Sequence, residues 1–243
     1  MRNRIVVVPL LCLPLWTPAA ETPPSPAPAP SPSSMQKAAD TASSIVYRPP
    51  SRGAPAKRIG GSTRGISIVP VVTVLAPDHV ALTSSEQPTL YWYLSAASSI
   101  RIEVARIDAA EAKPLIEVSY PSVEPGIHRF ELRAFDIRLK PKEEYQWSVT
   151  SVVTEKDRSR EIVSRSTFRL AETPAVRANN PASAKEQQAV AYAEEGLWHD
   201  ALHALSEGIS TAPERRDLRA MRADLLEQAG LRAAAAFDRR AAR

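Results

Sequence analysis

Between residues 89 and 150, apolar and polar side chains alternate with a period of two. In the stretch 90–94, Leu, Trp and Leu fall on one face, while Tyr91 and Tyr93 fall on the other. This is the period of a β-strand, whose successive side chains point to opposite faces. The alternation recurs in residues 100–104, 116–120, 130–134, 145–149 and, less regularly, 162–170. It predicts antiparallel strands with one face on a core and one face in water.

Turn-rich segments separate these stretches, and the apolar run 66–75 adds another strand. About seven short strands at this spacing indicate a β-sandwich over residues 66–173, with a small barrel as the alternative. Leu139, Pro141 and Tyr145 resemble the tyrosine corner of immunoglobulin-like and fibronectin-type domains. The resemblance implies an all-β sandwich of that kind, in which the Tyr hydroxyl bonds the backbone of the preceding turn.

Residues 181–243 change to a helical pattern. Gly196-Leu197 and Gly230-Leu231 lie 34 residues apart, which is the tetratricopeptide period. The segment therefore predicts a small α-helical, tetratricopeptide-like hairpin plus part of another, with Ala201 where the helices approach. About three such repeats are needed for an independent array. We expect the hairpin to pack on the sandwich or on a partner.

The N-terminus reads as an export signal. Residues 1–20 have a basic start, an apolar run from Ile5 to Trp16 and small residues before a polar shift. This is the pattern of a secretory signal peptide cleaved near Ala20. An uncleaved anchor is the alternative, but a membrane span needs about 20 apolar residues. We expect an exported protein, periplasmic or extracellular, whose mature chain has no transmembrane helix. Cys12 lies in the apolar run, so the mature chain has no cysteine.

Residues 21–65 form a Pro-, Ser- and Ala-rich arm that we expect to be mostly disordered. Its basic residues are spread over residues 48–64, which allows weak peripheral contact with an anionic surface. Neither of the two folded zones is basic. We therefore expect no nucleic-acid partner.

The sequence carries no recognisable catalytic, cofactor or metal motif, and we expect none of these sites. Two alternatives stay open. His199 and His203 have the spacing of a helical metal pair but lack a convincing third ligand. His79 with Ser84 or Glu86 could serve a hydrolase if the fold brought them together.

Candidate interaction residues come from three places. Two basic residues border a glycine-rich segment, residues 60–65, that could cradle an anion or simply form a turn. Two tyrosines lie on the strand face opposite the predicted core, and an aromatic pair opens the second helix of the hairpin. The candidates are Arg58, Arg64, Tyr91, Tyr93, Trp198 and His199.

Several segments together resemble a bacterial exported family known as domain of unknown function 928. They are Tyr47–Gly53, Gly60–Gly65, Leu82–Thr89, Pro125–Gly126, Tyr145–Trp147 and Tyr192–Leu202. The resemblance covers about residues 45–207 and implies no reaction, because the family has no established activity. Its glycine-rich segment often continues into a Cys, whereas Ile66 follows here. A disulfide of such relatives cannot form in this chain.

Together these features predict an exported, non-enzymatic protein that serves as an interaction or scaffold module for a protein partner in the cell envelope. An unrecognised envelope hydrolase or a glycan-binding module is the alternative.

Overall fold

The computed structural model of the chain describes residues 45–50, 70–107, 114–152, 161–172 and 184–243. Within them, eight strands form two sheets and four α-helices follow. The strands are β1 (Val72–Val74), β2 (Ala81–Thr83), β3 (Thr89–Leu94), β4 (Ser98–Arg106), β5 (Ile116–Val123), β6 (Gly126–Glu131), β7 (Glu144–Val152) and β8 (Ile162–Leu170). The helices are α2 (Lys185–Glu194), α3 (Trp198–Thr211), α4 (Arg216–Gln228) and α5 (Arg232–Ala241). The prediction of a sheet-rich domain followed by helices is confirmed.

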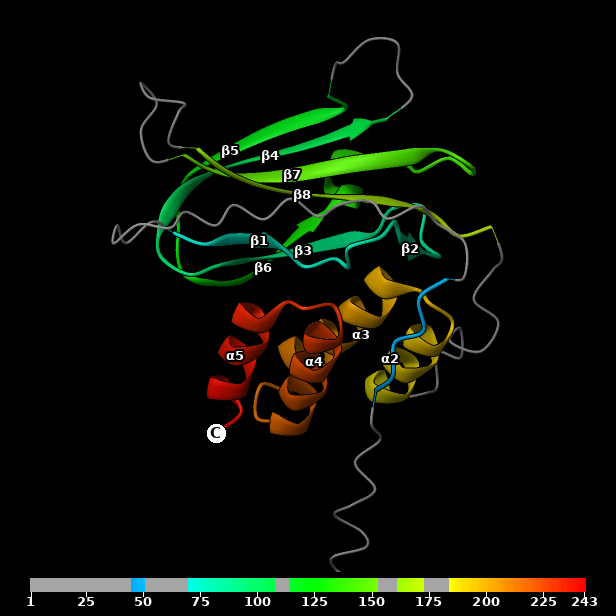
Figure 1. The fold of residues 1–243 in the computed structure, drawn as a ribbon, viewed down its shortest axis with the longest axis vertical. Helices are drawn as coiled ribbons and strands as arrows, with labels where there is room; N and C mark the ends of the chain where they lie inside the picture. The colour runs from blue at the N-terminus through cyan, green and yellow to red at the C-terminus, as the bar shows by residue number, and fades with distance from the viewer. Residues whose placement is uncertain (1–44, 51–69, 108–113, 153–160, 173–183) are drawn as a thin grey trace, which may run out of the picture. The chain divides into compact units, whose positions relative to one another are not determined.

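The two sheets form two layers (Figure 1). One has the strand order β1–β3–β6 and the other β2–β8–β7–β4–β5. Every pairing is antiparallel except that of β2 with β8. Because the strands divide into two separate sheets, the barrel alternative is wrong. Apolar side chains from both layers form one core, with Trp147, Phe130 and Phe168 among its largest fully buried members.

Three strands differ from the sequence prediction. The parallel strand β2 was not predicted, since three residues are too few to show a period. β6 ends at Glu131, because residues 132–135 turn into a short 3₁₀ helix, η1, that closes at Asp136 in the left-handed region. β1 spans only three residues of the predicted stretch 66–75, of which residues 66–69 lie outside the described chain.

The local interaction expected of Tyr145 is present. The backbone N–H of Lys140 donates to the Tyr145 hydroxyl oxygen over 3.0 Å. That hydroxyl in turn donates to Glu143 over 2.7 Å. Burial and this carboxylate hold the pKa of the tyrosine above its ordinary value, although the Lys140 N–H bond opposes the shift. Tyr145 thus fixes the turn that leads into β7.

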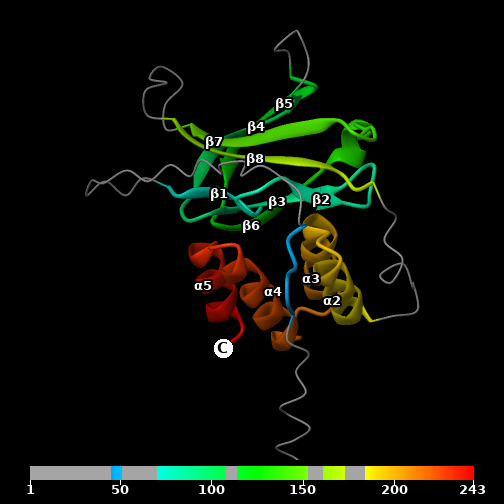
Figure 2. The same cartoon turned by 45° about the vertical axis from the view of Figure 1, so that its right-hand side comes forward.

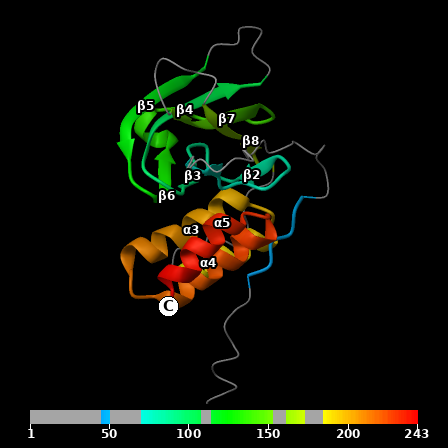
Figure 3. The ribbon, with the colours of Figure 1, turned by 60° about the vertical axis from the view of Figure 1, so that its left-hand side comes forward.

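The helices form two hairpins, α2 with α3 (Figure 1) and α4 with α5 (Figure 3). Their hydrogen bonds repeat with the predicted spacing of 34 residues. The amide of Leu197 donates to Tyr192 O and that of Leu231 to Leu226 O, both over 2.9 Å. Each bond spans a glycine with positive φ, Gly196 at 77° or Gly230 at 70°. Glycine reaches this left-handed conformation without the strain of a Cβ. The two hairpins are therefore two copies of one structural unit.

None of the described helices is both long and apolar enough to cross a membrane. Residues 1–20 and most of the predicted arm 21–65 lie outside the described residues. The exception in the arm is the segment 45–50, where we predicted disorder. It lies between α2 and α4, as the blue segment of Figure 2 shows, and makes the contacts described below.

Candidate functional site

The first turns of α3 fasten the helices to the β domain. The indole N–H of Trp198 donates to the carbonyl oxygen of Leu75 over 2.8 Å. Ser84 donates to the Asp200 carboxylate from both its hydroxyl, over 2.6 Å, and its backbone N–H, over 3.0 Å. A fourth hydrogen bond, of 2.9 Å, joins the Tyr91 hydroxyl and Nδ1 of His203. We call this set of contacts the joint.

Burial controls the charges of the joint. Burial raises the pKa of Asp200, and the two bonds from Ser84 oppose that rise. Burial also raises the pKa of Tyr91 to about 12 and lowers the pKa of His203. The joint is therefore made of polar groups that the surrounding protein disfavours in their charged forms.

His199 lies beside the joint and is fully buried, with 1% of its surface exposed. Neither ring nitrogen has a hydrogen-bond partner among the described residues. Its ring meets Phe168 edge-on, with centroids 5.7 Å apart. Burial lowers the pKa of His199 to about 3, so the imidazole is neutral at physiological pH.

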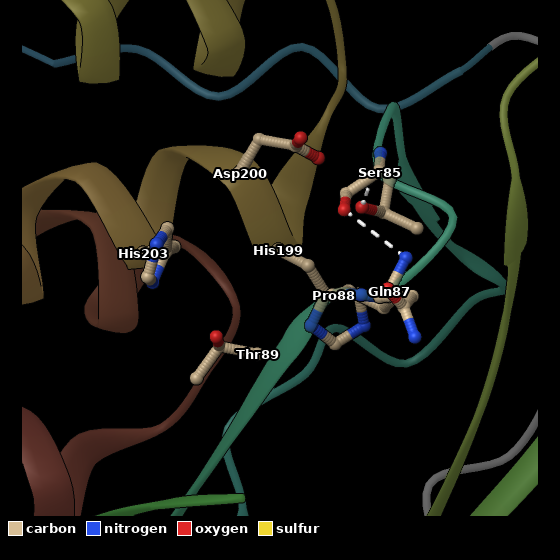
Figure 4. Close-up of a pocket in the computed structure, with 8 residues that line it drawn as sticks. Ser85, Gln87, Pro88, Thr89, His199, Asp200 and His203 are labelled. Atoms are coloured by element: carbon tan, nitrogen blue, oxygen red, sulfur yellow. Dashed lines mark hydrogen bonds between the residues drawn. The ribbon is translucent and has the colours of Figure 1, made fainter. Parts of the chain in front are cut away.

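A small pocket of about 70 Å³ lies between α3 and the segment that joins β2 to β3. His199, Asp200 and His203 line one side, and Ser85 and Gln87 line the other (Figure 4). Sites for drug-sized ligands measure about 300–1,000 Å³, so this pocket is far too small for one. Among the described residues, no group of three His, Cys, Asp or Glu side chains is placed to hold a metal ion.

The predicted interaction residues have a different setting from the one expected. Tyr91, Tyr93, Trp198 and His199 are all buried, with 6% or less of their surface exposed. Tyr93 lies against Phe237 of α5, with ring centroids 5.7 Å apart. The expectation of an exposed patch at Tyr91 and Tyr93 is therefore wrong, because the helices of the same chain cover that face of β3. Arg58 and Arg64 lie outside the described residues.

The structure does not assemble the hydrolase set. His79 bonds the Tyr47 hydroxyl through Nε2, while Ser84 bonds Asp200. Glu86 accepts a bond from Arg138. Each side chain thus has a different partner, and none of the three lines the pocket beside the joint.

The segment 45–50, which we call the strap, is held by its backbone. Gln228 of α4 accepts from the Tyr47 N–H and donates to the Ile45 carbonyl, both over 2.9 Å. The Arg48 N–H donates to the carbonyl oxygen of Ala193, near the end of α2, over 3.0 Å. The same carbonyl accepts from the Gly196 N–H over 3.1 Å at the end of the helix, so the strap supplies its second donor.

The side chain of Tyr47 enters the space between the helices and the β domain. Its ring stands edge-on to Trp198 at 5.0 Å between centroids and stacks on His79 at 5.8 Å. Its hydroxyl bonds His79 Nε2 over 2.9 Å, and burial raises its pKa well above the ordinary value. We call the surface formed by His79, Ala193, Gly196, Trp198 and Gln228 the groove.

Sequence reasoning did not find the groove. Tyr47 stood in a segment used only for the family resemblance, and Gln228 was one polar residue at the end of a helix. The available signal was the pair Ile45 and Tyr47, two large apolar residues at strand spacing in an arm otherwise poor in them.

The comparison with known families bears on most of the chain. The profile of a family described as Domain of Unknown Function (DUF928) matches residues 59–237. The chain belongs to this family. The match begins later than the resemblance suggested and continues through α4 into α5. The strap precedes it, so the family profile covers the groove without its occupant.

No curated protein matches the sequence. Among the solved structures that match, two illustrate how weak the likeness is. One is an engineered protein with 14% identity and a TM-score of 0.27, for which 42% of this chain and 20% of that chain are covered. This chain thus spans about a fifth of its length. The other is a multi-domain immunophilin from Arabidopsis thaliana with 8% identity and a TM-score of 0.19, for which 82% and 99% are covered.

Proposed function

We propose that this DUF928 protein is an exported, non-enzymatic interaction module of the cell envelope that binds a protein partner on its helical hairpins. The observation that carries the proposal is the strap. The hairpins already hold an extended stretch of polypeptide through its backbone. Backbone bonds give such recognition its affinity and side-chain pockets give it specificity. The structural bonds of His79, Ser84 and Glu86 support a role without catalysis.

The proposal includes two finer assignments of architecture. We infer an immunoglobulin-like sandwich, because β1, β3 and β6 correspond to strands A, B and E, and β4, β7 and β8 to strands C, F and G. The bond of Tyr145 to the preceding turn supports this assignment. We infer tetratricopeptide-like hairpins from the hydrogen bonds that recur at 34 residues.

Export is tested with residues 1–40 fused to alkaline phosphatase, which needs an oxidising compartment to form its disulfides. The proposal expects phosphatase activity from this fusion. A Leu11→Arg change interrupts the apolar run of the signal and should abolish that activity. An inactive wild-type fusion would refute export by this segment.

The interaction surface is tested in cells with a photo-crosslinking residue at one of two exposed positions. Glu194 lies at the end of α2 beside the groove, and Glu117 lies on β5 of the β domain. The proposal expects a discrete adduct from position 194, weakened by Gln228→Ala, and none from position 117. The same adducts from both positions, or one indifferent to Gln228→Ala, would contradict it.

A further inference from the structure

We propose that the strap is a resident ligand in cis, and that the groove takes an extended partner segment with an aliphatic residue followed, two positions later, by an aromatic one. This inference rests on the proposed function and names both the class of partner and the control of its access. The partner has to displace residues 45–50 from the groove.

The backbone contacts define an extended ligand. The side-chain amide of Gln228 binds the strap on both sides of Val46, because it accepts from the Tyr47 N–H and donates to the Ile45 carbonyl. The carbonyl oxygen of Ala193 accepts from the next N–H along the strap, that of Arg48. None of these bonds involves a side chain of the strap. They fit any extended segment with free peptide groups at these positions.

The side chains supply the selectivity. Ile45 is 4% exposed, whereas Val46 beside it is 47% exposed. Tyr47 again turns inward, against Trp198 and His79. The groove therefore reads every second residue, as an extended segment requires. Its two side-chain positions are an aliphatic one and an aromatic one with a hydroxyl in reach of His79 Nε2.

The bound chain also approaches the backbone of the first hairpin closely, at Gly196. A Cβ at Gly196 would lie 2.8 Å from the carbonyl oxygen of Arg48, so the chain in the groove passes directly over this glycine. The equivalent Gly230 of the second hairpin has nothing within 4 Å of such a Cβ. At this repeat position the first hairpin contacts the strap, through Gly196, and a Cβ in the second hairpin would contact none of the described residues.

Tethering explains how such a small ligand controls the site. The strap is six residues long and makes three backbone hydrogen bonds with the hairpins. A short tether gives a linked segment an effective concentration of about 1 mM. If the free segment binds with a Kd of about 100 µM, the tether weakens binding of a competitor by about ten-fold. A partner with this pattern competes when its own affinity or local concentration is higher.

The test uses residues 21–243 and a fluorescein-labelled peptide with the sequence of residues 43–52. In the strap variant Ile45→Ser/Tyr47→Ser the groove is vacant, and we expect saturable binding by fluorescence anisotropy. Wild type should bind about ten-fold more weakly. Adding Gln228→Ala to the strap variant should abolish binding. A peptide with serine at both inward positions should not bind, whereas one with Val46→Ser should bind like the parent.

A second measurement does not depend on the strap variant. Val46→Cys places a thiol at an exposed position of residues 21–243, which contain no other cysteine, and a bimane label there reports the surroundings of the strap. Excess unlabelled peptide 43–52 should change the bimane emission of the folded protein, because the displaced strap moves the label into water. No change at millimolar peptide, or equal binding with and without Gln228, would overturn the inference. A dimer held by exchanged straps, detected by sedimentation, would also overturn it in favour of a second copy.

The outcomes separate this inference from the proposed function. If the peptide fails to bind while the crosslink from position 194 persists, the hairpins bind a partner but not in the groove. If the peptide binds while no crosslink forms in cells, the groove is a peptide site and the interaction role is refuted.

Discussion

Trp198 and Leu75, 123 residues apart in sequence, are joined by a hydrogen bond of 2.8 Å from the indole N–H to the carbonyl oxygen. The indole is fully buried, and the ring of Tyr47 stands edge-on to it. One side chain therefore contacts the β domain, the helical hairpins and the strap. The joint and the groove share Trp198, so a substitution at this residue alters both.

Trp198→Phe tests the bond of the joint. It keeps an aromatic ring but leaves the Leu75 carbonyl without its indole donor, which costs about 1–3 kcal/mol beyond the loss of ring volume. Trp147→Phe is the matched control, since Trp147 is equally buried and its indole N–H has no partner among the described residues. Urea unfolding should show the larger loss for Trp198→Phe. Equal losses would mean that the bond contributes nothing.

The buried imidazole of His199 predicts acid sensitivity. Its pKa is lowered from 6.5 to about 3 in the folded protein, so between these values the unfolded state binds more protons. Stability should therefore fall as pH drops through this window, by at most about 1.4 kcal/mol per pH unit from this group. His199→Leu should flatten the profile of unfolding free energy against pH. A profile of unchanged slope would refute the assignment.

Asp200 should act in the opposite direction. Its pKa is raised above 3.8, so the folded state keeps a proton that the unfolded state releases. Stability from this group is lost as pH rises through the raised pKa. Asp200→Asn should remove that loss at higher pH while retaining a partner for Ser84. A variant whose stability falls with pH as steeply as wild type in that range would contradict the prediction.

The glycine pair tests the packing of the strap. Both Gly196→Ala and Gly230→Ala place a Cβ on a backbone with positive φ, which costs about 1–2 kcal/mol. Only the first also meets the Arg48 carbonyl. Gly196→Ala should lose more stability and change the emission of a bimane label at position 46 toward that of a label in water. If both variants behave alike, the strap does not press on Gly196.

Ala201 tests the crossing of the helices. It is fully buried in α3, so Ala201→Trp should overpack the hairpin by about 1–3 kcal/mol. The exposed Ala233 of α5 is the control, and Ala233→Trp should be close to neutral. Far-UV circular dichroism during urea unfolding measures both. Tolerance of tryptophan at position 201 would contradict tight packing there.

The sequence predicted the elements well because their signals are local. The alternation at residues 100–104 and 145–149 became β4 and β7, and the spacing of Gly196 and Gly230 became two equivalent helix ends. Burial of both faces of β3 was not predictable in this way. Tyr91 and Tyr93 looked exposed because the residues that cover them, His203 and Phe237, lie more than 100 positions away.

The groove was missed for a related reason. A backbone clamp has no side-chain signature in the segment that it holds, since Gln228 bonds only peptide groups of Ile45 and Tyr47. The proline-rich composition around the strap indicated disorder. Composition is judged over a long stretch of chain, so it does not reveal an ordered segment of only six residues. Contacts between such distant parts of a chain depend on how the hairpins dock, which local patterns do not encode.

Amide hydrogen exchange at Tyr47 and Arg48 in residues 21–243 tests the central claim most directly. Both N–H groups donate hydrogen bonds, to Gln228 and to Ala193. The account predicts that both are protected in the free protein and lose protection when a competing peptide 43–52 saturates the groove. Exchange of both amides at the rate of an unstructured peptide in the free protein would show that the strap does not occupy the groove.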